Sequence, residues 1–382
     1  MKTHLLQQLS AAGQAIWLDF VDRQFLADGG LRQLIQEDAL TGVTSNPTIF
    51  EKAMGHGDAY DEGFKAFLAK SNPDVTVTDI YESQAIRDIQ DAADDLRPTY
   101  ERLGGCDGYV SLEVSPYFAQ NTPGTVEEAR RMWAAVNRPN LMVKVPATPS
   151  ATAAIRQLIE DGLNINITLL FSKSSYQEVA DAFMAGLEGR IEAGKPIDKV
   201  ASVASFFVSR IDAQIDKLID ERVKNNDEMS DALKALRGKV AIANAKLAYV
   251  TYREMIASGR WQALAAHGAM PQRLLWASTG SNDPNYSPTI YIDALIGPDT
   301  VNTMPPKTMD AFREQGAVAE TLTQDIESAR FVLAETERLG LDLERITKDL
   351  VQDGVKQFAD ASDKLLAAVE KKRIEFRAST QT

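Results

Sequence analysis

The chain has 382 residues, 44% of them hydrophobic, and 41 Lys and Arg against 54 Asp and Glu residues give a formal net charge of −13. This composition is globular, and the length allows two or three domains of about 100 to 200 residues or one α/β barrel of about 250 residues or more. Nucleic acid and anionic membranes bind positive surfaces, so the acidic balance argues against both as partners.

Cysteine and histidine are scarce. The single cysteine, Cys106, cannot form an intramolecular disulfide, and the three histidines lack the spacing of a zinc site. This pattern predicts no zinc site, and neither a metal nor another cofactor is expected. The N-terminal segment lacks the apolar core of a secretory signal, and no run of 18 apolar residues occurs, so we expect a cytoplasmic protein without a membrane span.

Short apolar runs rich in β-branched residues alternate with longer segments of helical periodicity, which is the pattern of a parallel sheet with crossover helices. Eight such runs occur, at residues 15–20, 42–45, 109–114, 141–145, 164–169, 200–205, 273–277 and 300–304. No Pro- or Gly-rich linker divides the chain. The sequence thus predicts an α/β protein with a single (β/α)8 barrel domain over residues 1–382, of which residues 306–382 are mostly helices packed over the barrel.

Several helices can be placed between and after these runs. A helix is expected over residues 125–138, opened by a capping box of Thr125 and Glu128. A second is expected over residues 174–193, with Gly194 at its C-terminal end. Apolar residues also keep a helical period over residues 315–339 and 343–370.

Polar side chains alternate with apolar ones in the middle runs. In the fifth run, Asn166 and Thr168 share one face, although a strand buried on both faces is normally apolar throughout. Glu113 and Lys144 lie opposite the apolar faces of the third and fourth runs. The alternation therefore points a lysine and a carboxylate into the same barrel interior as Asn166 and Thr168.

Further polar residues end the other runs. Asp19 closes the first run, Asn46 follows the second in Thr-Ser-Asn-Pro, and Ser205 closes the sixth. Six strands thus bring polar groups to the carboxyl end of the barrel, where such barrels carry their active sites.

Lys144 has two interpretations. A lysine amine held away from water forms Schiff bases with carbonyls. Alternatively, Lys144 pairs with Glu113 or Asp19 in a structural ion network, because buried charges are usually paired. Asn46 has a structural alternative as well, since an Asn before Pro commonly forms a turn.

Three segments resemble the hallmark sequences of the transaldolase family, whose members are Schiff-base enzymes of the pentose phosphate pathway. They are residues 41–47 (TGVTSNP), 140–148 (NLMVKVPAT) and 165–172 (INITLLFS). Residues 297–305 (GPDTVNTMP) resemble the eighth strand of the longer bacterial subgroup. The family fold is a (β/α)8 barrel, in agreement with the eight runs.

The resemblance implies roles for the catalytic positions. Lys144 matches the lysine that forms a Schiff base with the dihydroxyacetone fragment. Asp19 matches the acid/base on the C4 hydroxyl. Glu113 matches the carboxylate that acts through a catalytic water, assisted by Thr168. The matching substrate contacts are Asn46, Asn166 and Ser205.

Phosphate recognition departs from the family pattern. Arg210 matches the phosphate arginine and lies near the start of a helix, whose N-terminus also attracts anions; the alternative is a surface ion pair. Many members carry Ser-Phe-Arg after the seventh strand, whereas this chain has Ser-Thr-Gly-Ser, so the second arginine is missing. The candidates to replace it are the hydroxyls of Ser278 and Ser281, backbone amides around Gly280, and Lys307.

The expected function is a transaldolase that moves dihydroxyacetone from sedoheptulose 7-phosphate to glyceraldehyde 3-phosphate, giving erythrose 4-phosphate and fructose 6-phosphate. Sugar phosphates are the expected partners, and the chain is expected to be a homodimer or a monomer. The nearest alternative is a fructose 6-phosphate aldolase; those relatives carry Gln and Tyr where this chain has Glu113 and Phe207. The alternative from another functional class is a barrel without catalytic activity that senses sugar phosphates or serves as a scaffold. The complete set of polar residues argues against it: Asp19, Asn46, Glu113, Lys144, Asn166 and Thr168.

Overall fold

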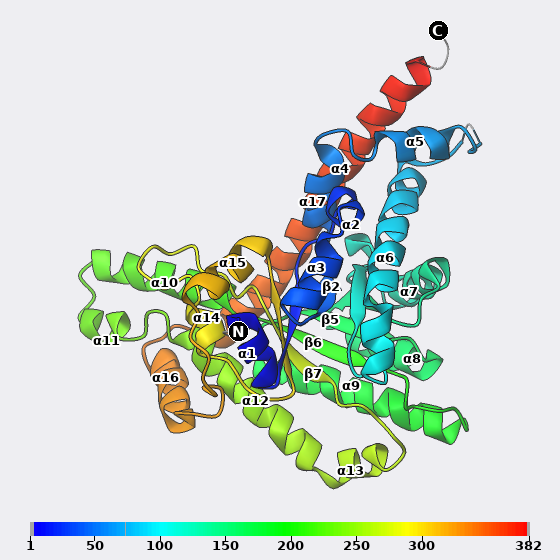
Figure 1. Cartoon of the computed structure of the whole chain (residues 1–382). Helices are drawn as coiled ribbons and strands as arrows, with labels where there is room; N and C mark the ends of the chain where they lie inside the picture. The colour runs from blue at the N-terminus through cyan, green and yellow to red at the C-terminus, as the bar shows by residue number, and fades with distance from the viewer. Residues whose placement is uncertain (1–3, 73, 380–382) are drawn as a thin grey trace.

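The computed structural model describes residues 4–72 and 74–379. At its centre, eight parallel strands follow one another in sequence order and close into a barrel, with helices around it (Figure 1). The strands are β1 (Gln14–Leu18), β2 (Leu40–Thr44), β3 (Tyr109–Glu113), β4 (Leu141–Pro146), β5 (Ile165–Leu170), β6 (Ser202–Phe207), β7 (Arg273–Ala277) and β8 (Thr300–Met304). Each predicted run matches one strand to within two residues at either end, so the predicted (β/α)8 barrel is confirmed.

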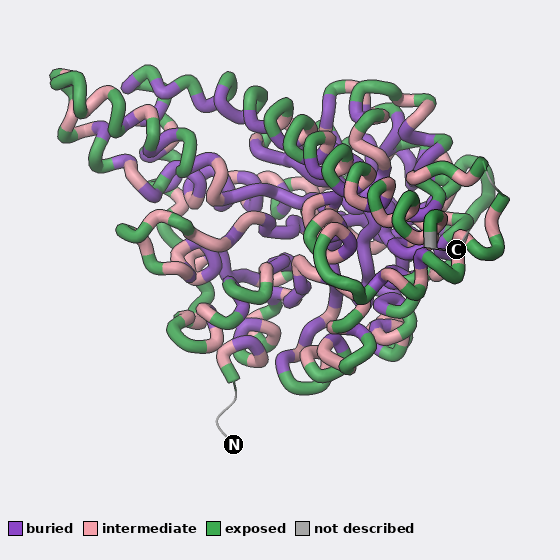
Figure 2. The backbone as a smooth tube through the Cα atoms, turned by 90° about the horizontal axis from the view of Figure 1, so that it is seen from above, coloured by how far each residue is buried: buried purple, intermediate pink, exposed green. Residues whose placement is uncertain are grey.

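Helices connect the strands, as parallel pairing requires. They are α1 (Leu5–Ala11), α2 (Arg23–Ala27), α3 (Gly30–Glu37), α4 (Pro47–Gly55), α5 (Asp61–Leu68), α6 (Val77–Arg102), the 3-10 helix η1 (Pro116–Phe118), α7 (Thr122–Val136), α8 (Ala151–Asp161), α9 (Lys173–Glu192), α10 (Ser209–Lys224), α11 (Ser230–Lys234), α12 (Val240–Ala257), α13 (Gly259–Ala265), α14 (Ile290–Asp293), α15 (Pro306–Gln315), α16 (Ile326–Arg338) and α17 (Leu343–Ser379). Buried residues concentrate on the strands and the inner faces of these helices (Figure 2). No helix in the described part of the chain is long and apolar enough to span a membrane.

Helix α7 begins earlier than its sequence pattern predicts. Its N-cap is Asn121, whose side chain accepts the backbone N–H of Gly124 at 3.0 Å, and Pro123 lies in the first turn, where its missing N–H costs nothing. Thr125 is already inside the helix and donates its hydroxyl to the carbonyl of Phe118 at 2.8 Å. The predicted capping box is therefore wrong, because a better capping residue precedes it.

The tail also differs from its prediction in one segment. Residues 316–325 are not helical, so the predicted helix over residues 315–339 is wrong in its first half. The backbone N–H groups of Thr321 and Leu322 both donate to the carbonyl of Ile296 at 3.0 Å, and Leu322 is fully buried. Leu322, one of the apolar residues whose spacing predicts the helix, is thus buried in a loop instead. In contrast, α9 lies within one residue of its predicted bounds, and Gly194 follows its end at a φ of +68°.

Helix α17 is the longest helix of the described chain, and its C-terminal end projects beyond α4 and α5 (Figure 1). It packs against β5, α4, α6 and η1, elements that all lie at or follow the carboxyl ends of strands. The helix therefore crosses the end of the barrel where the predicted polar groups converge.

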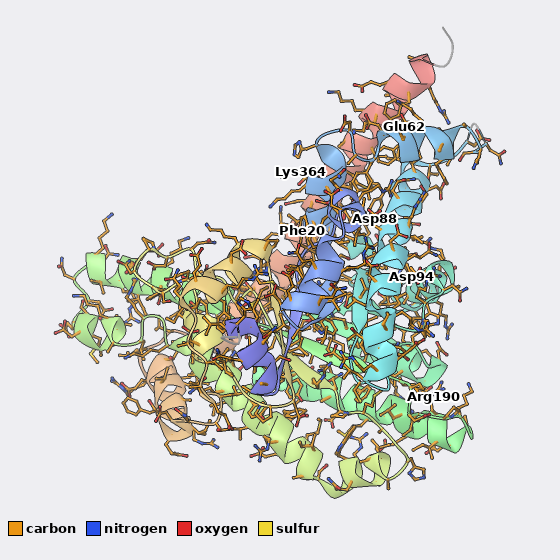
Figure 3. All side chains as sticks on the ribbon, viewed as in Figure 1. Phe20, Glu62, Asp88, Asp94, Arg190 and Lys364 are labelled. Atoms are coloured by element: carbon orange, nitrogen blue, oxygen red, sulfur yellow. The ribbon has the colours of Figure 1, made fainter. Side chains whose placement is uncertain are left out.

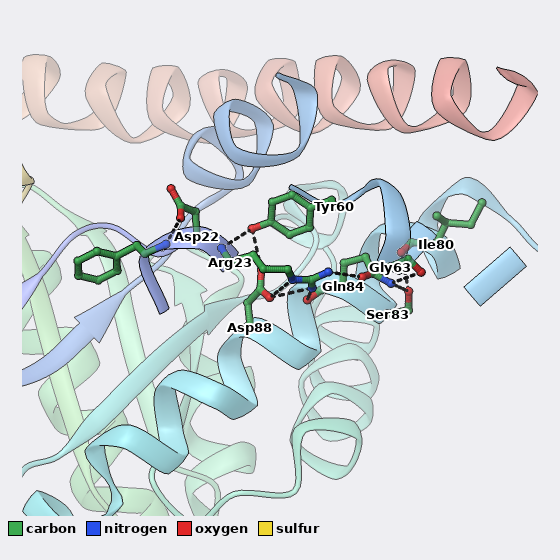
Figure 4. A network of polar contacts seen from close by, with 9 residues as sticks. Asp22, Arg23, Tyr60, Gly63, Ile80, Ser83, Gln84 and Asp88 are labelled. Atoms are coloured by element: carbon green, nitrogen blue, oxygen red, sulfur yellow. Dashed lines mark hydrogen bonds and ion pairs between the residues drawn. The ribbon is translucent and has the colours of Figure 1, made fainter. Parts of the chain in front are cut away.

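A buried polar network holds the chain after β1. Asp88 of α6 accepts from Arg23 at 2.8 Å and from the Tyr60 hydroxyl at 2.7 Å, while Arg23 also donates to the Gln84 side chain at 2.7 Å (Figure 4). The two ends of this connection can be located in Figure 3 by the labels of Asp88, on α6, and of Phe20, the residue directly after Asp19. Because Arg23 opens α2, this network ties the segment that carries Asp19 to the rigid helix α6.

Candidate active site

A row of three polar side chains crosses neighbouring strands at the carboxyl end of the barrel. In the sheet register Glu113 of β3 pairs with Lys144 of β4, and Lys144 pairs with Asn166 of β5. Registered residues of parallel neighbours point to the same face, here the barrel interior. All three side chains are buried, so the alternation in the sequence correctly predicts their common direction.

Lys144 lies at the centre of this row. Its Nζ donates to the backbone carbonyl of Ser45 at 3.1 Å and lies 3.5 Å from Oε2 of Glu113. The ring centroid of Phe358, from α17, lies 6.0 Å from Nζ. The amine thus lies between the Ser45 carbonyl, the Glu113 carboxylate and the Phe358 ring, away from bulk water.

Glu113 has an unusual acid–base environment. Burial raises the pKa of its carboxyl to about 7, and the nearby positive charge of Lys144 only partly opposes this shift. Its Oε2 has no hydrogen-bond partner among the described residues, and neither has the buried Oγ1 of Thr168. A carboxyl whose pKa lies near neutrality can take up or release a proton at physiological pH.

Two side chains from β5 and β6 form a hydrogen-bonded chain with β3. The Ser205 hydroxyl donates to Oδ1 of Asn166 at 2.7 Å, and Nδ2 of Asn166 donates to Oγ of Ser111 at 3.0 Å. These bonds fix the direction of the Asn166 amide. The sequence predicts Asn166 and Ser205 as site residues, whereas Ser111 is placed on the same strand face as Glu113, two residues earlier, but without a role.

Asp19 lies just beyond the end of β1. Its Oδ1 accepts from the Thr44 hydroxyl at 2.6 Å, and Thr44 in turn lies 2.7 Å from the hydroxyl of Thr303 on β8. Burial raises the pKa of Asp19, against the charges of Lys144 and Arg210 and the Thr44 hydrogen bond. Thr44, which the sequence did not single out, orients this carboxylate.

A cavity of about 480 Å³, here called the mouth cavity, opens above these groups. Asp19, Asn46, Arg210 and Phe358 line it, together with Phe20, Asp22, Thr48, Ile49, Lys52, Ala53, Pro305 and Pro306. Asn46 also accepts the N–H of Ile49 at 3.1 Å and so caps α4. Asn46 therefore has the structural role at this turn that its place before Pro47 predicts, and it also lines the cavity.

Arg210 joins the mouth cavity to a larger one of about 940 Å³, here called the outer cavity, whose lining residues include Arg210, Lys217, Arg237, Ser278, Gly280 and Ser281. The guanidinium carbon lies 5.1 Å from the Phe207 ring centroid, and Nη1 is buried without a hydrogen-bond partner. Burial lowers the pKa of Arg210, against the charges of Asp19 and Glu113. A buried guanidinium nitrogen with unused donors is suited to an oxyanion rather than to a surface ion pair.

Ser278 lies where β7 ends, in a left-handed conformation at a φ of +55°. Its carbonyl accepts the N–H of Ser209 at 3.0 Å, and the two hydroxyls lie 2.8 Å apart at the start of α10. At Gly280 a Cβ would lie 2.6 Å from Oγ1 of Thr308, so a larger side chain there requires a shift of its neighbours. Lys307 is exposed and lines neither cavity, although the preceding Pro306 lines the mouth cavity.

Arg237 is a lining residue of the outer cavity that sequence reasoning missed. It forms ion pairs with Asp220 and, at 3.3 Å, with Asp283. The residue precedes α12 and carries no signal in the sequence that separates it from an ordinary surface arginine. Only the folded chain places it on the same cavity wall as Arg210.

A parallel barrel whose strand ends converge on a buried lysine, two carboxylates and a partly buried arginine defines a (β/α)8-barrel enzyme. The chain belongs to the transaldolase/fructose-6-phosphate aldolase family, whose model matches residues 16–369.

Relatives at high identity cover almost the whole chain. Transaldolase of Trichodesmium erythraeum is 44% identical over 97% of this chain and 98% of its own length. Those of Parafrankia sp. and Thermobifida fusca are each 45% identical over 95% of this chain, and over 96% and 97% of their own lengths. The chain is accordingly an enzyme of the transferase class, like these relatives.

Proposed function

We propose that the protein transfers a dihydroxyacetone unit from sedoheptulose 7-phosphate to glyceraldehyde 3-phosphate, reversibly, as a cytoplasmic enzyme of the pentose phosphate pathway. The observation that carries this proposal is the buried amine of Lys144, 3.5 Å from a carboxyl that titrates near neutrality. Transfer of the three-carbon unit from fructose 6-phosphate to erythrose 4-phosphate is the assay that tests it, and a purified enzyme without such transfer would contradict it.

In the proposed mechanism the Lys144 amine adds to the ketose carbonyl at C2, and loss of water gives a protonated imine. Asp19 then takes the proton of the C4 hydroxyl. The C3–C4 bond breaks, C4 becomes the aldehyde of the first product, and the electron pair moves into the imine to give an enamine. The positive imine serves as the electron sink that makes this cleavage possible.

Glu113 and Thr168 serve the steps that use water. Oε2 of Glu113 and Oγ1 of Thr168 are buried and form no hydrogen bond within the described chain, so they offer acceptors and a donor to one water molecule, and such groups commonly hold ordered water. Glu113 would take a proton from this water as it adds to the imine, and would return one when the carbinolamine loses water.

The remaining predicted residues bind the substrate in this proposal. Asn46, Asn166 and Ser205 contact the hydroxyls of the three-carbon unit. Arg210 and Ser278 bind the phosphate, with the Ser209 hydroxyl beside that of Ser278 at the start of α10, where backbone N–H groups favour an anion, and with Ser281 on the wall of the same cavity. An arginine with a free buried nitrogen makes Arg210 the main electrostatic contact.

Arg210→Gln tests the phosphate site. We expect kcat/KM for fructose 6-phosphate to fall about 100-fold, because a charge-assisted contact of roughly 2 to 3 kcal/mol is lost. With fructose, which has no phosphate, the variant and the wild type should differ little. Lys217→Gln, a neighbouring cation on the outer cavity, is the matched control. An equal loss with both sugars would contradict the assignment.

The pH dependence tests Glu113. A carboxyl whose pKa in the free enzyme is raised to about 7 is half protonated there, so we expect kcat/KM to fall as the pH drops through about 7, as the base form disappears. Glu113→Gln should remove this acid limb and lower kcat at pH 8. Glu128→Gln, a carboxylate on α7 paired with Arg131, is the control and should keep the limb. A limb that persists in Glu113→Gln would assign the ionisation to another group.

A fructose 6-phosphate aldolase remains the alternative function. Such relatives carry Gln and Tyr at the positions of Glu113 and Phe207, and Phe207 here packs against the Phe171 ring at 5.2 Å. Both residues favour transfer over release. The two functions are separated by measuring dihydroxyacetone formed from fructose 6-phosphate without an acceptor; release as fast as transfer would favour the aldolase.

A further inference from the structure

Helix α17 is anchored over the barrel mouth on both sides of Phe358. One turn before Phe358, Gly354 lies so close to β5 that a Cβ there would be 2.7 Å from a methyl carbon of Leu169. Beyond Phe358, Asp363 accepts a hydrogen bond from the Tyr117 hydroxyl in η1, just after β3. Figure 4 shows the helix running above the neighbouring elements. These contacts determine how far above the strand ends the Phe358 ring lies.

The Phe358 ring faces the centre of the active site. Only 6% of the residue is exposed, it lines the mouth cavity together with Asp19 and Asn46, and its centroid lies 6.0 Å from Nζ of Lys144. A ring at this distance leaves space for a small carbon chain on the lysine. It also covers that chain with an apolar surface that offers water no hydrogen bond.

The enamine bound to Lys144 can react in two ways, by transfer to an acceptor or by release as dihydroxyacetone. In transfer, C3 forms a bond to the aldehyde carbon of the acceptor, and the aldehyde oxygen takes a proton from Asp19. In release, C3 takes a proton from a water molecule, and the remaining hydroxide adds to the iminium carbon. The carbon–nitrogen bond then breaks to give dihydroxyacetone and the free amine. Release therefore begins with water reaching C3.

We infer that Phe358 is a specificity-determining residue, which covers C3 of the bound three-carbon unit and so directs it to transfer rather than release. The inference rests on the proposed function. Asp19 acts at C3–C4 and shares the mouth cavity with Phe358, so C3 lies on the side of the imine that the ring covers. The imine carbon is hydrolysed from the side of Glu113 and Thr168, so covering C3 does not block release of the transfer product.

The test compares release with transfer in one enzyme. Wild type and Phe358→Ala are incubated with fructose 6-phosphate, with and without erythrose 4-phosphate, and free dihydroxyacetone and sedoheptulose 7-phosphate are measured. The ratio of release to transfer should rise about tenfold or more in Phe358→Ala, because the mouth admits water. Phe358→Leu keeps an apolar side chain of similar reach, and its ratio should rise less.

Val369→Ala is the matched control. Val369 is fully buried on the same helix, about three turns further along, so its truncation weakens the packing of α17 without opening the site. Its ratio should equal that of the wild type. An unchanged ratio in Phe358→Ala, or an equal rise in Val369→Ala, would overturn the inference while leaving the proposed function intact. A wild type without transfer would instead contradict the proposed function.

Discussion

Lys144→Ala should lower the transfer of dihydroxyacetone by about 10⁴-fold or more, the scale of loss when a covalent nucleophile is removed. Borohydride reduction of the wild type in the presence of fructose 6-phosphate should add one reduced three-carbon unit, located on Lys144 by mass spectrometry of peptides. The variant should carry no adduct, since no other group at the strand ends combines an amine with this burial and a carboxylate partner in the described chain.

Two control variants make this result specific. Lys144→Arg retains a cation beside Glu113 and the Ser45 carbonyl but has no amine that condenses with a ketone, so it should be as inactive as Lys144→Ala. Lys52→Ala removes an amine that lines the mouth cavity and should still form the adduct. An adduct that survives in Lys144→Ala, or that disappears in Lys52→Ala, would contradict the assignment of Lys144.

The two interpretations of Lys144 from the sequence are compatible in the folded protein. Lys144 pairs with Glu113, as a structural network predicts. Yet burial raises the pKa of Glu113 to about 7 despite this partner, which a purely structural pair does not need. A carboxyl whose pKa lies near neutrality can exchange a proton as the reaction proceeds, so the contact of Glu113 with Lys144 supports the proposed reactive site.

The barrel and the inward-facing row were predictable because strands have a period of two. A parallel barrel buries both strand faces, so polar residues such as Lys144 and Asn166 at alternate positions stand out against an apolar background. Helix boundaries were less predictable, since several residues near Thr125 can cap a helix and Asn121 with Pro123 is the stronger pair.

Contacts between distant segments were not predictable from local pattern. Phe358 has the helical period of any buried residue, and nothing in the sequence near it indicates that it faces Lys144, more than two hundred positions earlier. Arg237 reaches the cavity of Arg210 in the same way, through the packing of α11 and α12 around α10. Such residues are recognised only when the tertiary structure is known.

Asp19→Asn should lower kcat for cleavage of fructose 6-phosphate by about 10² to 10⁴-fold, the usual range for a general acid–base group. Asparagine keeps the shape and can still accept the hydrogen bond from Thr44, so the loss reports the missing proton acceptor rather than a disturbed strand end. Because imine formation precedes the step that Asp19 serves, the variant should still give a borohydride adduct on Lys144, now with the mass of the whole sugar phosphate.

The mass of this adduct distinguishes the roles of the two residues. A trapped six-carbon unit places the block after imine formation and before cleavage of the C3–C4 bond, whereas the wild type accumulates the three-carbon unit. Asp22→Asn, which alters another carboxylate on the mouth cavity, should behave like the wild type. If Asp19→Asn gave no adduct, or the three-carbon adduct at the wild-type level, the carboxylate would not be the group that takes the C4 proton.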